Sequence, residues 1–247
     1  MDRIRLSALL ADLSVAPGVA DELRSLLGRT FGDDELTAAW RDRPPPPEAS
    51  PTLPDRYEDR GLLGIGGMGE VRRVHDRVLG REVALKLVRA DLSLRLDVVE
   101  RFVAEARATA ALAHPGIVPV HDHGFTPDGR PYFTMQEVRG ETFAAGIRRV
   151  HDEPGRSGLE LRRLIDRLER AAEAVGYAHA RGVVHRDLKP ANLLVGEHGE
   201  VRVVDWGLFR PDPTWDGPPA VAVAIAGTPA YMAPEQARGD VEAIGVR

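Results

Sequence analysis

The stretch His185-Arg186-Asp187-Leu188-Lys189-Pro190-Ala191-Asn192 decides how the rest of the 247-residue chain is interpreted. It brings a carboxylate, an ammonium group and an amide together on a loop that a proline stiffens. Asp187 can orient a hydroxyl and accept its proton, Lys189 can neutralise charge on a moving phosphate, and an Asn192 oxygen can bind Mg²⁺. These residues suit in-line phosphoryl transfer, although a charged surface turn before a strand has a similar composition.

A second phosphate-binding pattern lies upstream, in Gly64-Ile65-Gly66-Gly67-Met68-Gly69-Glu70-Val71. Its spacing, G-x-G-x-x-G-x-V, lets the backbone turn closely over phosphates because glycine has no Cβ. A dinucleotide-binding fold uses the same glycines, but it needs a helix directly after them. Here the pattern predicts a strand over 70–76, a turn at Leu79-Gly80-Arg81 and another strand over 82–88, which argues against the dinucleotide fold.

Lys86 lies within the second of these strands, at the end of the apolar run Val83-Ala84-Leu85-Lys86. A lysine in an apolar strand is costly to bury unpaired, so we expect a carboxylate beside it. The helix predicted over residues 97–112 offers two glutamates, Glu100 and Glu105.

Together these segments resemble the protein kinase superfamily, and in particular the bacterial serine/threonine protein kinases of the eukaryotic-like type. Residues 185–192 fit H-R-D-L-x-x-x-N at every fixed position, and Val83-Ala84-Leu85-Lys86 fits V-A-x-K. Asp205-Trp206-Gly207 resembles D-F-G with tryptophan in place of phenylalanine, and residues 227–235 end in A-P-E. Independent motifs in one order are far more specific than any one of them.

The resemblance implies an α+β, bilobal protein-kinase-like fold. The N-lobe would be a five-stranded antiparallel sheet with one main helix, and it would span residues 55–138 with the hinge. A partial, mainly helical C-lobe would span 139–247. Upstream of both, apolar periodicity predicts short helices in residues 1–42, and prolines mark an extended linker over 43–54.

In the family, further helices follow the A-P-E segment, whereas this sequence ends at Arg247. We therefore expect a truncated product or a fragment. A C-lobe without those helices would expose a large apolar surface, so poor stability or aggregation is a further expectation.

By the same resemblance, four charged side chains would be catalytic: Asp187, Lys189, Lys86 and Glu105. Glu105 is preferred to Glu100 as the partner of Lys86, because the surrounding residues match the R-F-x-x-E-A of bacterial relatives. Asn192 and Asp205 would hold Mg²⁺ or Mn²⁺.

ATP would lie against the glycine loop, an apolar sandwich and the hinge backbone. The implied contacts are Gly64, Ile65, Gly66, Gly67, Met68, Gly69, Val71, Ala84, Lys86, Met135, Gln136, Val138 and Leu194.

The implied activity is ATP-dependent phosphorylation of serine and threonine hydroxyls on proteins, as in signal transduction. Lys189 and the segment Gly227-Thr228-Pro229 favour the Ser/Thr class over tyrosine, and we expect Thr228 to contact Asp187. Self-association for autophosphorylation and a regulatory phosphosite at Thr214 are hypotheses. The alternatives are a pseudokinase that acts as a nucleotide-binding scaffold and, ranked lower, a small-molecule kinase of the same fold.

The amino-acid composition argues against several other kinds of site and partner. Without cysteine there is no disulfide framework or thiolate metal site, which fits a cytoplasmic location. A net charge of -5 gives no global attraction to nucleic acid, and no apolar run is long enough to cross a membrane.

Two further helices are predicted, over residues 141–150 and 159–180. The second is the stronger, and its apolar stripe comprises Leu161, Leu164, Ile165, Leu168, Ala171, Ala172, Val175 and Ala178.

Overall fold

A computed structural model describes residues 51–152, 158–207, 210–211, 227–240 and 242–245. The chain divides into two compact units. The first contains the residues up to Val99 together with Asp122–Thr134, and the second contains Glu100–His121 and Met135–Arg247. The helices expected in 1–42, most of the linker and Thr214 lie outside the described residues.

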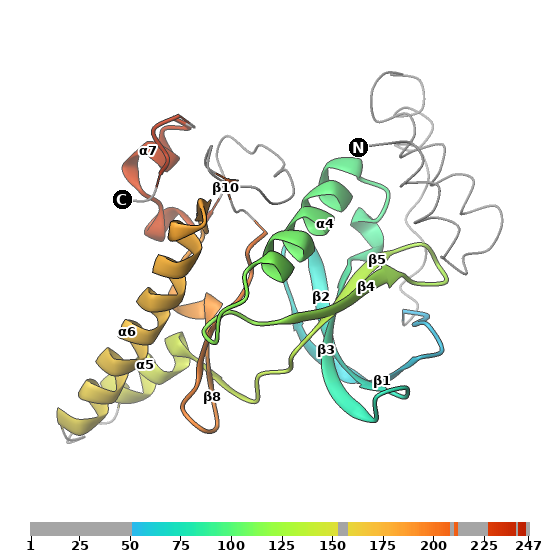
Figure 1. The fold of residues 1–247 in the computed structure, drawn as a ribbon, viewed down its shortest axis with the longest axis horizontal. Coiled ribbons are helices and arrows are strands. Elements are labelled where there is room, and N and C mark those ends of the chain that lie inside the picture. Colours follow the sequence, from blue (N-terminus) through green and yellow to red (C-terminus); the bar gives the residue numbers. More distant parts are fainter. Residues whose placement is uncertain (1–50, 153–157, 208–209, 212–226, 241, 246–247) are drawn as a thin grey trace. The chain divides into compact units, whose positions relative to one another are not determined.

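The first unit is built on a five-stranded sheet in the order β1-β2-β3-β5-β4, which confirms the expected N-lobe architecture (Figure 1). The strands are β1 Tyr57–Ile65, β2 Gly69–Asp76, β3 Arg81–Val88, β4 Val120–Phe125 and β5 Pro131–Met135. The 3-10 helix η1 (Ala90–Leu92) and helix α4 (Leu96–Ala111) follow β3. Since β2 and β3 pair antiparallel directly after the glycines, the predicted hairpin is also confirmed.

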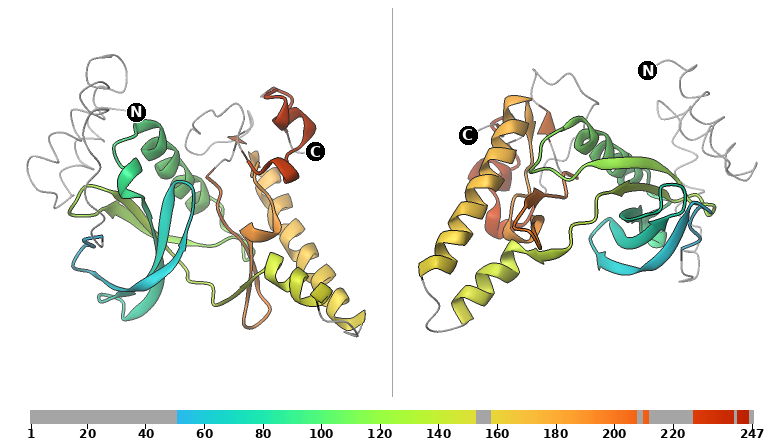
Figure 2. Two further views of the ribbon diagram at one scale, coloured as in Figure 1. Left: turned by 180° about the vertical axis from the view of Figure 1, so that it is seen from behind. Right: turned by 60° about the horizontal axis from the view of Figure 1, so that its bottom comes forward.

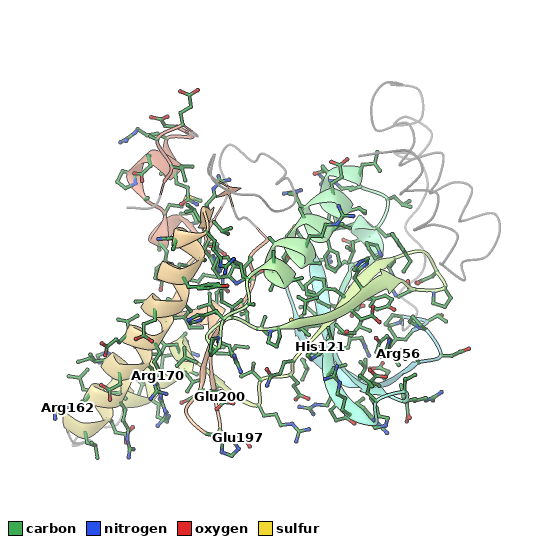
Figure 3. The ribbon with its side chains drawn as sticks, viewed as in Figure 1. Arg56, His121, Arg162, Arg170, Glu197 and Glu200 are labelled. Atoms are coloured by element: carbon green, nitrogen blue, oxygen red, sulfur yellow. The ribbon has the colours of Figure 1, made fainter. Side chains whose placement is uncertain are left out.

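Arg56 ties the beginning of this sheet to the β2–β3 turn, and Figure 3 labels its side chain. Its Nε and Nη2 donate to the two oxygens of Asp76 at 3.0 and 2.8 Å, and its Nη1 donates to Asp122 at 2.8 Å. Asp76 in turn accepts hydrogen bonds from the backbone N–H groups of Val78 and Leu79 at 3.0 and 3.3 Å. The hydrogen bonds from Arg56 lower the pKa of the buried Asp76 to about 2.

This depressed pKa predicts acid-sensitive stability. Its stabilising effect is complete well above the unfolded-state pKa of about 3.9, and it is lost as the pH falls through about 2. Asp76→Asn should therefore lower the free energy of unfolding at pH 7 by about 2 kcal/mol. The difference from the wild type should shrink as the pH falls from 4 to 2, as followed by urea unfolding.

Asp91→Asn is the matched control for Asp76→Asn. Asp91 also pairs with an arginine, at 2.8 Å, but its side chain is 47% exposed. Such a surface ion pair contributes little to the free energy of unfolding, so its loss should leave the unfolding curve nearly unchanged. Equal effects of the two substitutions, or a constant difference at every pH, would contradict the role given to Asp76.

The second unit contains most of α4, the remaining short strands and two further long helices. Its elements are β6 Gly140–Thr142, α5 Phe143–Asp152, α6 Gly158–Ala180, β7 Val183–Val184, η2 Pro190–Asn192, β8 Leu193–Gly196, β9 Val201–Val203, β10 Arg210–Pro211, η3 Pro229–Tyr231 and α7 Pro234–Ala237. Strands β6, β8 and β9 form one sheet, while β7 pairs with β10. Helix α5 lies alongside α6 (Figures 1 and 2).

The helix predicted from residue 141 begins later than expected. Glu141 and Thr142 instead belong to β6, where they pair with Val195 and Leu194 of β8. The Thr142 hydroxyl then accepts a hydrogen bond from the Ala145 N–H at 3.2 Å, as an N-cap residue does. The helix therefore begins at Phe143. Helical periodicity does not report strand pairing or capping, so it could not predict this boundary.

The apolar stripe predicted on α6 is only partly buried. Leu164, Ala171 and Ala178 do join the core, together with Ala174, which the stripe omitted. By contrast, Leu161, Ile165 and Leu168 are each more than half exposed, and Ala172 is exposed as well. The helix therefore packs through a narrower face of mostly small side chains.

Polar contacts hold the exposed side of α6 near the β8–β9 turn, since Arg170 Nη1 donates to the Gly199 carbonyl at 3.1 Å. Figure 3 shows Arg162 and Arg170 on the helix and Glu197 and Glu200 at that turn. In the described part of the chain, no helix combines the length and hydrophobicity required to span a bilayer.

Candidate active site

His185 is the internal support of the loop that follows β7. It is buried, its ring centroid lies 4.6 Å from that of Trp206, and its Nε2 lies 3.0 Å from the Val204 carbonyl oxygen. A carbonyl can only accept, so Nε2 carries the proton and Nδ1 accepts the Asp187 N–H at 3.2 Å. Burial lowers the pKa of His185, which favours the neutral ring that this pattern requires.

The Asp187 carboxylate is held from two segments of the chain. Lys189 Nζ donates to Oδ2 at 2.7 Å, while the Thr228 N–H and hydroxyl each donate to Oδ1 at 2.8 Å. Burial alone would raise the pKa of Asp187, but the hydrogen bonds from Lys189 and Thr228 outweigh it and lower the pKa. The carboxylate is therefore ionised and oriented at neutral pH, and the expected contact with Thr228 is confirmed.

Lys189 contacts Thr228 as well as Asp187. Its Nζ also donates to the Thr228 hydroxyl oxygen at 2.7 Å. A proton acceptor, a cation and a hydroxyl therefore converge in one place, which is the combination needed to bind a hydroxyl group and neutralise an anion beside it.

Asn192 and Asp205, the two predicted metal ligands, are linked through the backbone. Val204, next to Asp205, donates its N–H to the Asn192 carbonyl at 3.0 Å. Asn192 Nδ2 donates to the Asp187 carbonyl at 2.8 Å, and within the described residues its amide oxygen accepts no hydrogen bond. Amide and carboxylate oxygens suit Mg²⁺. Among the described residues no three His, Asp or Glu side chains form a metal site, so this pair would need oxygens from a bound molecule.

Backbone strain marks both segments that carry these residues. Arg186 and Asp205 have φ values of 67° and 65°, and they are the two non-glycine residues with positive φ in the described ranges. Such conformations cost about 1–3 kcal/mol and persist where the surroundings enforce them, commonly at functional sites. One precedes Asp187 and the other is a predicted metal ligand.

Trp206 fills the core behind the loop and is fully buried. A buried indole N–H ordinarily has a hydrogen-bond partner, yet the structure gives Nε1 no acceptor within the described residues. Burying an unpaired N–H costs about 1–3 kcal/mol. The ring is therefore held by packing, including its contact with His185.

The first unit groups several residues predicted to contact the nucleotide. The turn between β1 and β2 is closed by a hydrogen bond from Gly66 N–H to the Gly69 carbonyl at 2.8 Å. A Cβ on Gly69 would lie 2.7 Å from the Leu87 carbonyl oxygen, so only glycine fits there. Val71 lies directly opposite Lys86 in the β2–β3 register. The predicted phosphate-binding loop and Lys86 therefore share one hairpin.

Ala84 also lies in the first unit, on β3, whereas Met135, Gln136, Val138 and Leu194 lie in the second. Met135 ends β5, Gln136 donates its N–H to the Pro119 carbonyl at 3.1 Å, and Leu194 is part of β8. Glu105 is a buried residue of α4 in this unit, whereas Lys86 belongs to the first. The pairing of Lys86 with Glu105 stays a prediction.

Gln236 is a residue that sequence reasoning missed. Its Nε2 donates to the Arg186 carbonyl at 2.5 Å, next to Asp187. Its only signal in the sequence is its position directly after Ala233-Pro234-Glu235, which assigns it no chemistry.

Comparison with known proteins gives one matching family, described as the protein kinase domain, over residues 57–243. The chain is 40% identical over 212 residues to serine/threonine-protein kinase PknA of Mycobacterium tuberculosis, covering 81% of this chain and 47% of that protein. It is also 40% identical over 191 residues to serine/threonine-protein kinase PknB of Mycolicibacterium smegmatis, covering 76% of this chain and 30% of that protein. The chain therefore matches less than half the length of these curated relatives.

Proposed function

The chain belongs to the protein kinase domain family, and from this premise we propose that it transfers the γ-phosphoryl group of ATP to serine or threonine hydroxyls of proteins. The observation that carries the proposal is the Asp187 carboxylate, which Lys189 and Thr228 hold ionised and oriented. The names of the relatives, both serine/threonine-protein kinases, support the choice of acceptor.

In this proposal Asp187 orients the acceptor hydroxyl and takes its proton as the oxygen attacks the γ-phosphorus. The bond from that phosphorus to the bridging oxygen of ADP breaks at the same centre, so the phosphoryl group passes to the substrate oxygen. Lys189, 2.7 Å from Asp187 Oδ2, neutralises charge on the group in transit. Thr228 keeps the carboxylate turned toward the acceptor.

The Asn192 and Asp205 oxygens would hold Mg²⁺ or Mn²⁺, and the hard-oxygen chemistry of the pair fits either ion. When bound with ATP, the metal would neutralise negative charge on the phosphates. Lys86, aligned by Glu105, would bind the phosphates. The remaining nucleotide contacts would be the glycine loop over 64–69 with Val71, Ala84, Met135, Gln136, Val138 and Leu194.

The metal role gives a direct prediction. Asp205→Asn should raise the Mg²⁺ concentration needed for half-maximal transfer by about tenfold or more, because the loss of even an outer ligand partner costs about that much. Phosphate incorporation into casein would be measured across a Mg²⁺ titration. Asp91→Asn, at an exposed position outside the cluster, should leave the titration unchanged. An unchanged titration in Asp205→Asn would remove Asp205 from the metal site.

Protein substrates with a serine or threonine acceptor are the partners of this reaction, and self-association would permit autophosphorylation. Mass spectrometry after incubation with ATP and Mg²⁺ tests the acceptor type. Phosphate on serine and threonine is expected, whereas phosphate found mainly on tyrosine would contradict the proposal. The scaffold alternative is not favoured by any observation on the described residues.

A further inference from the structure

We propose that Gln236 is a positioning residue for phosphoryl transfer, which acts by holding the backbone that carries Asp187. The proposal deepens the function proposed above and rests on it. Gln236 belongs to α7, fifty residues beyond Arg186, and its side chain is buried. Its amide nitrogen donates to the Arg186 carbonyl oxygen at 2.5 Å.

The Arg186 carbonyl and the Asp187 N–H belong to the same planar peptide group. Gln236 binds the carbonyl end of this plane at 2.5 Å, and His185 Nδ1 accepts the N–H end at 3.2 Å. A plane held at both ends cannot rotate without breaking one of the two bonds. Because the Cα of Asp187 is attached directly to it, the orientation of this peptide determines where the Asp187 side chain begins, and Lys189 and Thr228 then hold its carboxylate.

The conformation held in this way is a strained one. Arg186 has φ 67°, a left-handed value that non-glycine residues avoid unless their surroundings enforce it. Preceding this residue, Val184 is fixed by its pairing with Arg210 in the β7–β10 ladder. Gln236 supplies a hydrogen bond to Arg186 itself.

Gly227 makes room for this bond. A Cβ at Gly227, whose φ is 125°, would lie 2.6 Å from Gln236 Nε2 and 2.9 Å from the Arg186 carbonyl oxygen. The next residue, Thr228, donates to the Asp187 carboxylate at 2.8 Å. The segment from Gly227 to Gln236 therefore contacts both the side chain of Asp187 and the backbone in front of it.

The chemistry of the bond calls for a donor at position 236. A glutamate has nearly the same size as glutamine, but its ionised carboxylate would place an acceptor against the Arg186 carbonyl. Once protonated, the same carboxyl group can donate an O–H to that oxygen. The effect of glutamate at position 236 should therefore depend on pH, both through the lost hydrogen bond and through the cost of burying a charge. A second variant without charge or donor, Gln236→Leu, separates these two causes.

The test is the pH dependence of Gln236→Glu, with transfer to casein measured from pH 5.5 to 8.5 and expressed as a ratio to the wild type. Ionisations that do not involve position 236, including those of casein, occur in both proteins, so the ratio removes their contribution. At pH 8 we expect kcat to fall by about tenfold or more, with KM for ATP within about twofold. The ratio should rise toward one as the pH falls.

Gln236→Leu keeps the apolar bulk without any donor, and it should lower kcat at every pH. Glu197→Gln at the exposed β8–β9 turn is the control for a single charge change, and its ratio should stay near one throughout. A pH-independent ratio for Gln236→Glu, or a loss confined to KM, would overturn the proposal.

A second readout needs no catalysis. Amide hydrogen exchange of the peptide containing Asp187 should be faster in Gln236→Leu than in the wild type, because one end of the peptide plane is released. If the wild type transfers no phosphate but this exchange difference appears, the proposed function fails and the positioning contact stands. If transfer occurs and neither exchange nor kcat changes, the positioning role fails alone.

Discussion

Asp187→Asn is expected to lower the rate of phosphoryl transfer by about a thousandfold, since a positioned general base contributes about 10²–10⁴. The asparagine oxygen can still accept from Thr228, but the amide cannot take up the proton of the acceptor hydroxyl. Its NH₂ group would also face the Lys189 ammonium, which donates to Oδ2 in the wild type. ATP affinity should stay within about twofold, because Asp187 acts on the acceptor and not on the nucleotide.

Asp166→Asn provides the matched control, because Asp166 is an exposed residue of α6 in the same unit. Initial rates of phosphate incorporation and the equilibrium binding of a fluorescent ATP analogue would be measured for both variants. The control should match the wild type in both quantities. Transfer by Asp187→Asn at more than about a tenth of the wild-type rate would remove Asp187 from the role of base.

Trp206→Ala is expected to lower the free energy of unfolding by about 3–5 kcal/mol. The indole is fully buried in the core of the second unit, against the His185 ring. Its removal leaves a cavity directly behind the loop that carries Asp187. We therefore expect turnover to fall as well, measured beside urea unfolding monitored by circular dichroism.

Trp206→Phe introduces the phenylalanine of the D-F-G motif. It separates the effect of packing from the effect of hydrogen bonding by the indole. It makes a smaller cavity and removes an N–H that has no acceptor within the described residues, so the net cost should be only about 1 kcal/mol. If phenylalanine proved as costly as alanine, the indole N–H and not the bulk of the ring would stabilise this part of the core. If alanine cost less than about 1 kcal/mol, Trp206 would not support the loop.

The sequence predicted the parts of this protein that depend on local chemistry. The octet at 185–192 and the glycine loop are both recognised by residue types at fixed spacing. The strand pattern directly after Gly69 predicted a hairpin and argued against a dinucleotide-binding fold. The five-stranded sheet followed from the family resemblance and is confirmed. Thr228 was also assigned correctly, because its motif places it opposite Asp187.

What the sequence could not predict depends on contacts between distant segments. Periodicity on α6 indicates which residues are apolar, but the neighbouring elements decide that Ala174 is buried and Ile165 exposed. Glu141 entered a strand because β8 was available to pair with it. Gln236 reaches Arg186 across fifty residues, and no local pattern could reveal that contact.

The central claim is that the cluster around Asp187 performs phosphoryl transfer. The most direct test is to incubate the purified chain with γ-labelled ATP, Mg²⁺ and casein, and to measure bound nucleotide and labelled phosphoserine and phosphothreonine in the same samples. We expect nucleotide binding together with transfer that Asp187→Asn lowers by about a thousandfold. Nucleotide binding without transfer, or transfer insensitive to Asp187→Asn, would contradict it.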